Sequence, residues 1–303
     1  MDNLCHSLVG LACGEAGLKQ RTAFGNATLV IASNIPDVDA LVFLTDTPSV
    51  AFRRGWTHGI LAQALLPIAL TAAIVIADRV IAGRRGRSPV VRPAAVLALS
   101  YAGVVLHILM DLLNTYGVRL LKPLSDRWYY GDAVFIIDPW LWLMLGAGVV
   151  LARRWRRVLP ARVALGTAAS YIAGMLWLAA VSRGAVLDAW LMARGEEPRA
   201  AMVGPAPLNP LRKAIIIDAG DHYQTGTLTW YPRAVRFAPG TIPKNADLPD
   251  VTRAREHDNV RAVLVWARFP YYEVASNAAS TVVTLRDVRF GDRVGVARVT
   301  LPR

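Results

Sequence analysis

Apolar residues in this chain are gathered into a few long runs instead of being spread evenly. Four runs are close to the roughly 20 residues that a helix needs to cross a hydrocarbon core about 30 Å thick. A core helix of a soluble protein rarely needs this length, so the runs predict membrane-spanning helices. They cover residues 60–82, 94–117, 134–152 and 163–181.

A further apolar stretch, residues 26–45, is interrupted by Asn34, Pro36, Asp37 and Asp39. Carboxylates at membrane depth are costly without partners, and they usually mark functional sites. Because proline is tolerated at the first position of a helix, we predict two short helices that meet at Asn34 and Pro36. Such a broken hairpin is stable in a membrane only where its irregular backbone faces protein.

The last third of the chain has a different pattern. Prolines and glycines before residue 211 predict a linker, and the segments beyond it alternate apolar with polar residues and are rich in Val, Ile, Thr and aromatics, which is typical of strands. These segments are KAIIID, GTLTWY, AVRF, RAVLVWARF, YYEVA, STVVTLRDV and RVGVARVTL.

The predicted fold class is therefore a membrane α-helical bundle joined to a small β-rich domain. The bundle, residues 1–182, contains about four clear transmembrane helices plus the N-terminal broken helical hairpin and carries the candidate site. Residues 183–210 are the predicted linker, and residues 211–303 form an antiparallel β-rich domain outside the membrane.

Composition supports the prediction of a membrane protein, since 54% of residues are hydrophobic and the mean hydropathy is +0.35. A net charge of +12 would suggest nucleic-acid binding in a soluble protein. Here the arginines are concentrated in two loops between predicted spans, as the positive-inside rule expects of cytoplasmic loops, and no nucleic-acid-binding module accompanies them. They are Arg84, Arg85, Arg87 and Arg92, and Arg153, Arg154, Arg156, Arg157 and Arg162.

The two arginine loops also predict an orientation. With both loops in the cytoplasm, the first and third clear spans run inward, and the β-rich domain lies outside the cytoplasm. We therefore expect a multi-pass protein of the inner (plasma) membrane. The first residues do not read as a cleaved signal peptide, because Asp2 replaces a basic start and His6, Glu15 and Lys19 interrupt the apolar run.

Candidate metal ligands lie on one predicted span. His107 and Asp111 are spaced i, i+4, so they share a helical face and can hold one ion together. The alternative is an intramembrane pair whose members only hydrogen-bond to each other. Metal binding is favoured because three of the five histidines fall in the membrane half beside carboxylates. The predicted metal ligands are His6, Asp37, His58, His107 and Asp111.

Nitrogen and carboxylate ligands in this mixture suit Zn²⁺, with Mn²⁺ or Fe²⁺ as alternatives. A metal ion with one coordination position left for water would indicate a catalytic site. Counted back from a helix end near Gly117, Asp111 and His107 would be recessed in the outer leaflet. The remaining histidines, His222 and His257, lie in the β-rich domain, where we expect solvated roles.

Other polar residues flank these candidates. Asp132 and Asp138 precede the third clear span, and they are either metal-site neighbours or turn and N-cap residues. Arginines on the predicted outer side can hold an anionic substrate. These are Arg53, Arg54 and Arg119.

Five motifs in order carry a family resemblance: HSLVG, NIPDVD, RRGWTHG, HILMDLLNTYG and SDRWYYGDAVFIIDPW. Residues 1 to about 155 resemble the YdjM-type inner-membrane metal-dependent hydrolase family. The order His, Asp, His, then His-x-x-x-Asp is also similar to the zinc-dependent phospholipase C and P1 nuclease group, whose members hydrolyse phosphoesters. That similarity implies one metal held by Asp37, His58, His107 and Asp111, with Asp111 bridging to a second metal held partly by His6. The further histidine pair and glutamate of that group have no match in the membrane half.

The leading hypothesis is a metal-dependent hydrolase that uses metal-activated water on a lipid-linked or membrane-proximal ester. The choice of a phosphoester rests on the resemblance alone. Asp39 or Asp37 would act as general base if not itself a ligand. The alternative is a non-enzymatic membrane protein, a metal carrier or an assembly factor with a structural metal, whose β-rich domain binds a partner protein.

Overall fold

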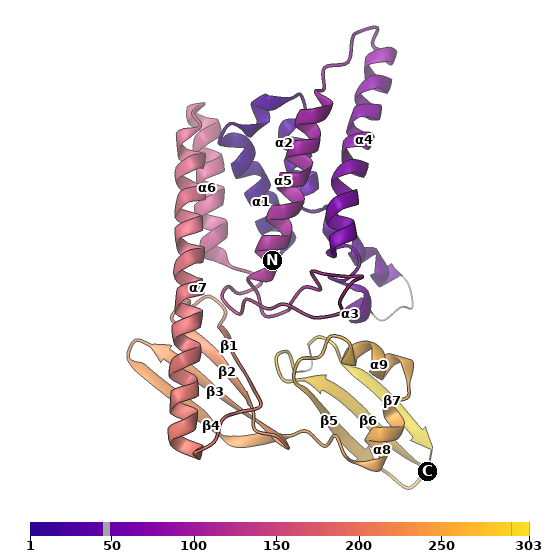
Figure 1. The fold of residues 1–303 in the computed structure, drawn as a ribbon, viewed down its shortest axis with the longest axis vertical. Coiled ribbons are helices and arrows are strands. Elements are labelled where there is room, and N and C mark those ends of the chain that lie inside the picture. The colour runs from indigo at the N-terminus through magenta and orange to yellow at the C-terminus, as the bar shows by residue number, and fades with distance from the viewer. Residues whose placement is uncertain (45–48, 292, 303) are drawn as a thin grey trace. The chain divides into compact units, whose positions relative to one another are not determined.

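The computed structural model describes residues 1–44, 49–291 and 293–302, which cluster into two compact units. The first unit holds Met1–Ala40 and Arg54–Trp177, and the second holds Leu41–Arg53 and Leu178–Arg303. Helices build the first unit, and two sheets dominate the second (Figure 1). Helix α7 begins in the first unit and ends in the second.

The helical unit contains two short 3-10 segments beside its α-helices. The second 3-10 segment, η2, runs past the unit boundary at Ala40, as α7 does at Trp177. The elements are α1 (Asn3–Glu15), η1 (Leu18–Arg21), α2 (Gly25–Ala32), η2 (Ile35–Leu44), α4 (Ile60–Arg84), α5 (Pro93–Leu112), α6 (Pro139–Trp155) and α7 (Leu159–Arg194).

Three helices, α4, α5 and α7, are long and apolar enough to cross a membrane, and the bent pair α2 and η2 would make a fourth span. The pair bends by 52° between Ala32 and Ile35, next to the predicted break at Asn34 and Pro36. Helix α6 has 17 residues, fewer than the roughly 20 of a typical span. The prediction of several membrane-length helices is thus confirmed, at three to four helices.

Two helix ends differ from the predicted ones. Helix α5 ends at Leu112, because Asn114 accepts a hydrogen bond from the Tyr116 amide and Gly117 has a φ of 88° that does not continue a helix. Asp111 therefore lies in the last turn of α5. The recessed position expected for Asp111 was counted from a helix end near Gly117, and this count does not apply. Helix α6 begins only at Pro139, where the Asp138 carboxylate caps it by accepting from Leu141 N at 3.0 Å.

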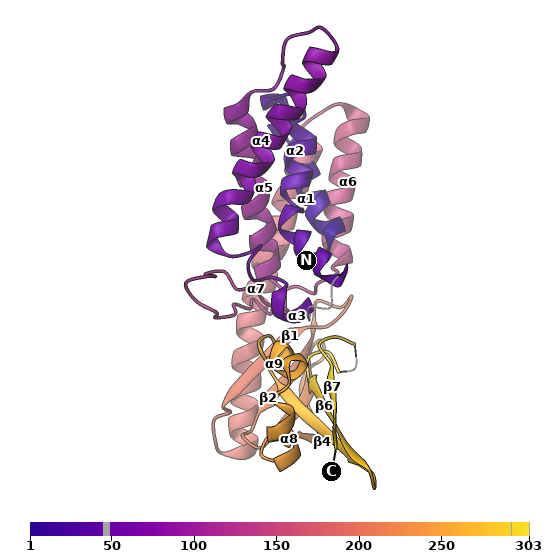
Figure 2. The same ribbon diagram turned by 90° about the vertical axis from the view of Figure 1, so that its right-hand side faces the viewer.

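Glycine allows α1, α2 and α5 to approach closely, and these helices lie side by side in both views (Figures 1 and 2). A Cβ on Gly103 of α5 would lie 2.4 Å from the Cβ of Ala32 in α2, and one on Gly10 of α1 would lie 2.9 Å from Leu29 O. Nearby, Ala32, Leu70 and Val104 form a small buried cluster. This packing brings the beginning of α1, the end of α2 and the end of α5 together.

The second unit contains two antiparallel sheets. Its first sheet has the order β1 (Ala200–Pro205), β2 (Arg212–Asp218), β3 (His222–Trp230) and β4 (Arg233–Pro243). The end of α7 covers one face of it, where Val186 and Trp190 pack on Ile215, Ile217 and Leu228. The second sheet has the order β5 (Pro270–Ser276), β6 (Ser280–Asp287) and β7 (Ala297–Pro302), and the unit also contains α3 (Ser49–Phe52), α8 (Pro249–Ala254) and α9 (Asp258–Leu264).

The predicted β-rich region is confirmed, but one predicted strand is wrong. The segment RAVLVWARF begins within α9, where Val260 and Val263, three residues apart, are both buried as on one helical face. Residues 183–210, predicted as a linker, contain the end of α7 and strand β1. Strand β1 has no clear strand signal in the sequence, because AAMVGP lacks the period-2 alternation and contains Gly and Pro.

Candidate metal centre

Four buried side chains converge within the helical unit. One ligand atom from each of Asp37, His58, His107 and Asp111 lies within 4.8 Å of the other three. Asp37 comes from η2, His58 from the turn before α4, and His107 and Asp111 from successive turns of α5. Their exposed fractions range from 0 to 8%. Buried Asp and His side chains gathered in this way can bind a metal ion.

The spacings test whether an ion fits. The Nε2 atoms of His58 and His107 face each other at 3.1 Å, and Asp111 Oδ2 lies 3.3 Å from the first and 3.6 Å from the second. Ligand atoms about 2.1 Å from a tetrahedral zinc ion are about 3.4 Å apart. Asp37 Oδ1 is slightly more distant, at 3.8 and 3.9 Å from the same two nitrogens. A small divalent ion fits with a slight inward movement of Asp37.

The ring of His107 is oriented by backbone. Its Nδ1 lies 2.8 Å from the carbonyl oxygen of Ser33, the C-cap residue of α2. A carbonyl only accepts hydrogen bonds, so Nδ1 must carry the proton and donate it. The Nε2 lone pair is then directed into the cluster, as a metal-ligating histidine requires.

The ring of His58 is oriented by a short chain of polar groups. The Thr57 hydroxyl donates to Asp39 Oδ2 at 2.9 Å, and its oxygen lies 2.9 Å from His58 Nδ1. The same carboxylate oxygen accepts from the backbone N–H of Arg54 at 2.8 Å and lies 3.5 Å from His58 Nδ1. These contacts suit an Nδ1–H donor and leave Nε2 free for a metal. The geometry therefore favours Asp39 as a residue that positions His58, more than as a general base.

Asp111 is held from its other side by Arg54. The guanidinium donates to Asp111 Oδ1 and to Asn114 Oδ1, each at 3.1 Å, and it stacks on the Tyr116 ring at 4.7 Å. Its residue exposure is 3%. In this arrangement Oδ1 is fixed by Arg54, while Oδ2 points toward the two histidines.

His6 lies beside the cluster. Its ring stacks on that of His107, with centroids 3.9 Å apart and planes 20° apart, and its Nε2 is 3.3 Å from Asp111 Oδ1. The buried Nδ1 atom has no hydrogen-bond partner among the described residues. The amino group of Met1 also contacts Asp111 Oδ1. Asp111 Oδ1, the oxygen that the resemblance assigns to a second metal ion, is thus already contacted by two cations, the Arg54 guanidinium and the Met1 amino group.

The structure places the remaining candidates in different surroundings. Arg119 donates its backbone N–H to Arg54 O, its guanidinium stacks on Trp128 at 5.0 Å, and it lies 3.5 Å from Asp126. The pKa of Asp126 is lowered, chiefly by its hydrogen bond from Lys122. Arg53 belongs to the second unit, where its guanidinium stacks on the Phe43 ring.

The two aspartates before α6 lie outside the four-residue cluster. Asp138 caps α6 and also accepts from the Tyr171 hydroxyl at 2.9 Å. Asp132 lies in the loop before α6, with a φ of 50°. In the second unit, His222 pairs with Asp221, and the exposed His257 precedes α9.

Several residues of the site were absent from the sequence predictions. Thr57 and Ser33 orient the histidines, Asn114 holds Arg54, and Asn3 donates to Asp37 Oδ2 at 3.2 Å. Only Thr57 and Asn114 had a sequence signal, because each is near a predicted ligand on the same segment. Ser33 acts through its carbonyl, which any residue could supply.

Comparison with known proteins gives two matches. The family described as YdjM inner membrane protein matches residues 1–182. The protein YfhP of Bacillus subtilis (strain 168), described as uncharacterized, is 22% identical over 160 residues, which cover 50% of this chain and 46% of YfhP. The chain thus spans about half the length of that curated relative. No solved structure matches the chain.

Proposed function

The chain belongs to the YdjM inner membrane protein family, and on that premise we propose that it is a membrane-embedded metal-dependent hydrolase acting on a lipid-linked or membrane-proximal phosphoester. The observation that carries the proposal is the buried cluster of Asp37, His58, His107 and Asp111. Two neutral imidazoles and two carboxylates suit Zn²⁺ best, with Mn²⁺ or Fe²⁺ as alternatives. The similarity to zinc-dependent phospholipase C and P1 nuclease supplies the choice of a phosphoester.

A divalent ion bound here would act as a Lewis acid and would lower the pKa of a coordinated water. The chain's own residues prepare the ligands for it. Ser33 and Thr57 fix the tautomers of His107 and His58, so neither ring needs to reorient when the ion binds. Arg54 fixes Asp111 through one carboxylate oxygen and leaves the other directed to the cluster.

Positive charge near the cluster supports an anionic substrate. Arg119 packs so closely on Gly55, beside Arg54, that a Cβ on this glycine would lie 2.3 Å from the guanidinium. Lys122 and Arg127 follow on the same loop. The Lys122 ammonium lies over the Trp56 ring, and the Arg127 guanidinium lies over the Tyr129 ring. Guanidinium and ammonium groups bind phosphate oxygens through charge-assisted hydrogen bonds. Arg54 itself already contacts Asp111, which leaves Arg119 as the better candidate for holding a substrate.

A second function has a specific observation in its favour. Four protein ligands are enough to close a tetrahedral zinc sphere, and closed spheres are typical of structural sites, whereas catalytic sites keep a position for water. A non-enzymatic protein with a structural metal, serving as a metal carrier or an assembly factor, would show this closed arrangement.

Metal content and turnover test both functions. We expect the purified full-length protein to contain a divalent metal, and His58→Ala and His107→Ala to lose most of it. The matched controls His222→Ala and His257→Ala should retain it, since neither residue lies in the cluster. Metal-loaded wild type should hydrolyse phospholipids, lipid-linked phosphates or aryl phosphates, and chelation should abolish the activity.

Cobalt substitution distinguishes the two functions directly. An open site should give an absorption spectrum that changes when inorganic phosphate is added, because phosphate takes the position of a coordinated water. A spectrum of four-coordinate cobalt that phosphate does not alter, together with no turnover on these three substrate classes, would favour the structural metal. Equal metal loss from all four histidine variants would contradict the assignment of the site.

A further inference from the structure

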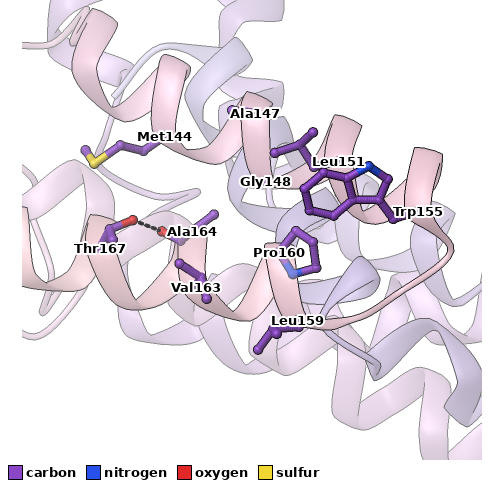
Figure 3. Close-up of a pocket in the computed structure, with 10 residues that line it drawn as sticks. All are labelled: Met144, Ala147, Gly148, Leu151, Trp155, Leu159, Pro160, Val163, Ala164 and Thr167. Carbon is purple, nitrogen blue, oxygen red and sulfur yellow. Dashed lines mark hydrogen bonds between the residues drawn. The ribbon is translucent and has the colours of Figure 1, made fainter.

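An apolar groove lies between α6 and α7 in the helical unit, remote in sequence from the metal ligands (Figure 3). Its volume is about 360 Å³, and it is open on one side. Gly148 brings the two helices together beside it, since a Cβ there would lie 2.2 Å from Ala164 Cβ. Thr167 lines the groove but donates its hydroxyl to Ala164 O at 3.0 Å, so its polar group is already satisfied.

Large apolar side chains at one end of this groove are exposed. Trp155, Leu159 and Val163 line the groove and are 56, 64 and 55% exposed. Apolar side chains gathered in this way indicate contact with lipid or with another apolar partner. Tryptophan is also enriched where helices meet the membrane interface.

The same end of the groove carries a concentrated positive charge. The turn that joins α6 to α7 contains a cluster of arginines, two of which are engaged, because Arg153 pairs with Glu15 at 2.9 Å and Arg162 donates to Ala16 O at 3.0 Å. Among the described residues, no carboxylate lies within ion-pair distance of the exposed Arg154, Arg156 and Arg157. In the sequence, these three arginines lie between or next to Trp155 and Leu159, two of the residues that line the groove.

We propose that this groove and its arginine turn form a binding site for an anionic phospholipid, with an acyl chain in the groove and the phosphate among Arg154, Arg156 and Arg157. Charge complementarity selects this occupant, since basic pockets between membrane helices bind anionic headgroups. An apolar peptide would leave the three arginines without counter-charges, whereas a phospholipid matches both halves of the site. The site is separate from the metal centre and does not depend on the proposed hydrolase activity.

The test measures retention of phosphatidylglycerol by the full-length protein, using native mass spectrometry after release from phosphatidylcholine nanodiscs that contain a minor fraction of it. We expect Arg154→Gln/Arg157→Gln to weaken apparent binding of phosphatidylglycerol by about 25-fold, since each arginine that contacts the anionic headgroup contributes roughly fivefold. The matched control Arg84→Gln/Arg85→Gln removes the same charge from the α4–α5 turn and should change binding by less than about threefold. An equal loss of phosphatidylglycerol binding in both double variants would show that general surface charge causes the effect, and it would overturn the proposal.

A second pair of variants tests the groove without changing charge. Ala147→Phe places a ring in the groove and should weaken phosphatidylglycerol binding. Val150→Phe should not, because Val150 is 61% exposed and does not line the groove. Unchanged binding in Ala147→Phe would overturn the acyl-chain assignment. A loss of dimers in Ala147→Phe with lipid binding intact would instead identify a second copy of the chain as the occupant. If Ala147→Phe fails to fold, the arginine comparison still decides the proposal.

Discussion

Replacing Gly103 with alanine tests whether helix packing sets the metal geometry. The added Cβ would lie 2.4 Å from Ala32 Cβ, about 1 Å closer than the 3.4 Å lower limit of ordinary contact. Helices α5 and α2 must therefore separate by roughly that distance, which costs about 1–3 kcal/mol in a packed core. The higher helix propensity of alanine returns up to about 1 kcal/mol. The shift also displaces His107 from Ser33 O and from Asp37, which follows α2.

Metal coordination tolerates errors of only about 0.2 Å, so a shift of this size should weaken metal affinity by about 10- to 100-fold. The assay is titration with a metal-buffered zinc series, combined with thermal unfolding in detergent. Gly166→Ala in α7 is the matched control, since nothing lies within 4 Å of the added Cβ. Equal metal affinity and equal thermal stability in the two alanine variants would refute the idea that close α2–α5 packing positions the site.

Two further predictions concern the second unit and the orientation. Lys213 in β2 is fully buried, its Nζ has no hydrogen-bond partner among the described residues, and burial lowers its pKa to about 8 from 10.5. Between these pH values the unfolded state holds a proton that the folded state lacks, so stability should rise with pH across this window, by on the order of 3 kcal/mol. Thermal unfolding at pH 7.5 and 10 should show this rise in wild type and a smaller one in Lys213→Met, and identical pH profiles would contradict it. A reporter fused at the C-terminus should be active only outside the cytoplasm and reporters in either arginine loop only inside it, whereas a cytoplasmic C-terminus would invert the predicted topology.

Much of the helical unit could be predicted because its signals are local. The i, i+4 spacing of His107 and Asp111 fixes their common face as soon as the segment is helical. Long apolar runs identify α4, α5 and α7 by length alone. Pro36 and the polar residues around it predicted the break between α2 and η2, since proline has no N–H to continue the preceding helix and is tolerated in the first turn of the next one.

The orientation of the site could not be predicted, because it depends on groups that carry no sequence signal. The carbonyl of Ser33 holds His107, and its position follows from the approach of two helices at Gly103. Arg54 was expected to face a substrate, but in the structure it holds Asp111, a contact between residues 57 positions apart. Long-range contacts of this kind emerge only from the assembled fold.

The site is built where helices end, and this placement bears on how a substrate could reach it. Irregular backbone at membrane depth is tolerated only where it faces protein or a water-filled cavity, and here the segments at the break before η2 and at the end of α5 both contribute residues to the same buried cluster. The turn from Arg119 to Lys122 packs against the His58 segment, where a Cβ on Gly59 would lie 2.4 Å from Lys122 O. His58, His107 and Asp111 are fully buried, whereas Asp37 is 8% exposed. We therefore expect water and substrate to enter past Asp37, the ligand whose slight inward movement would also complete the coordination of the ion.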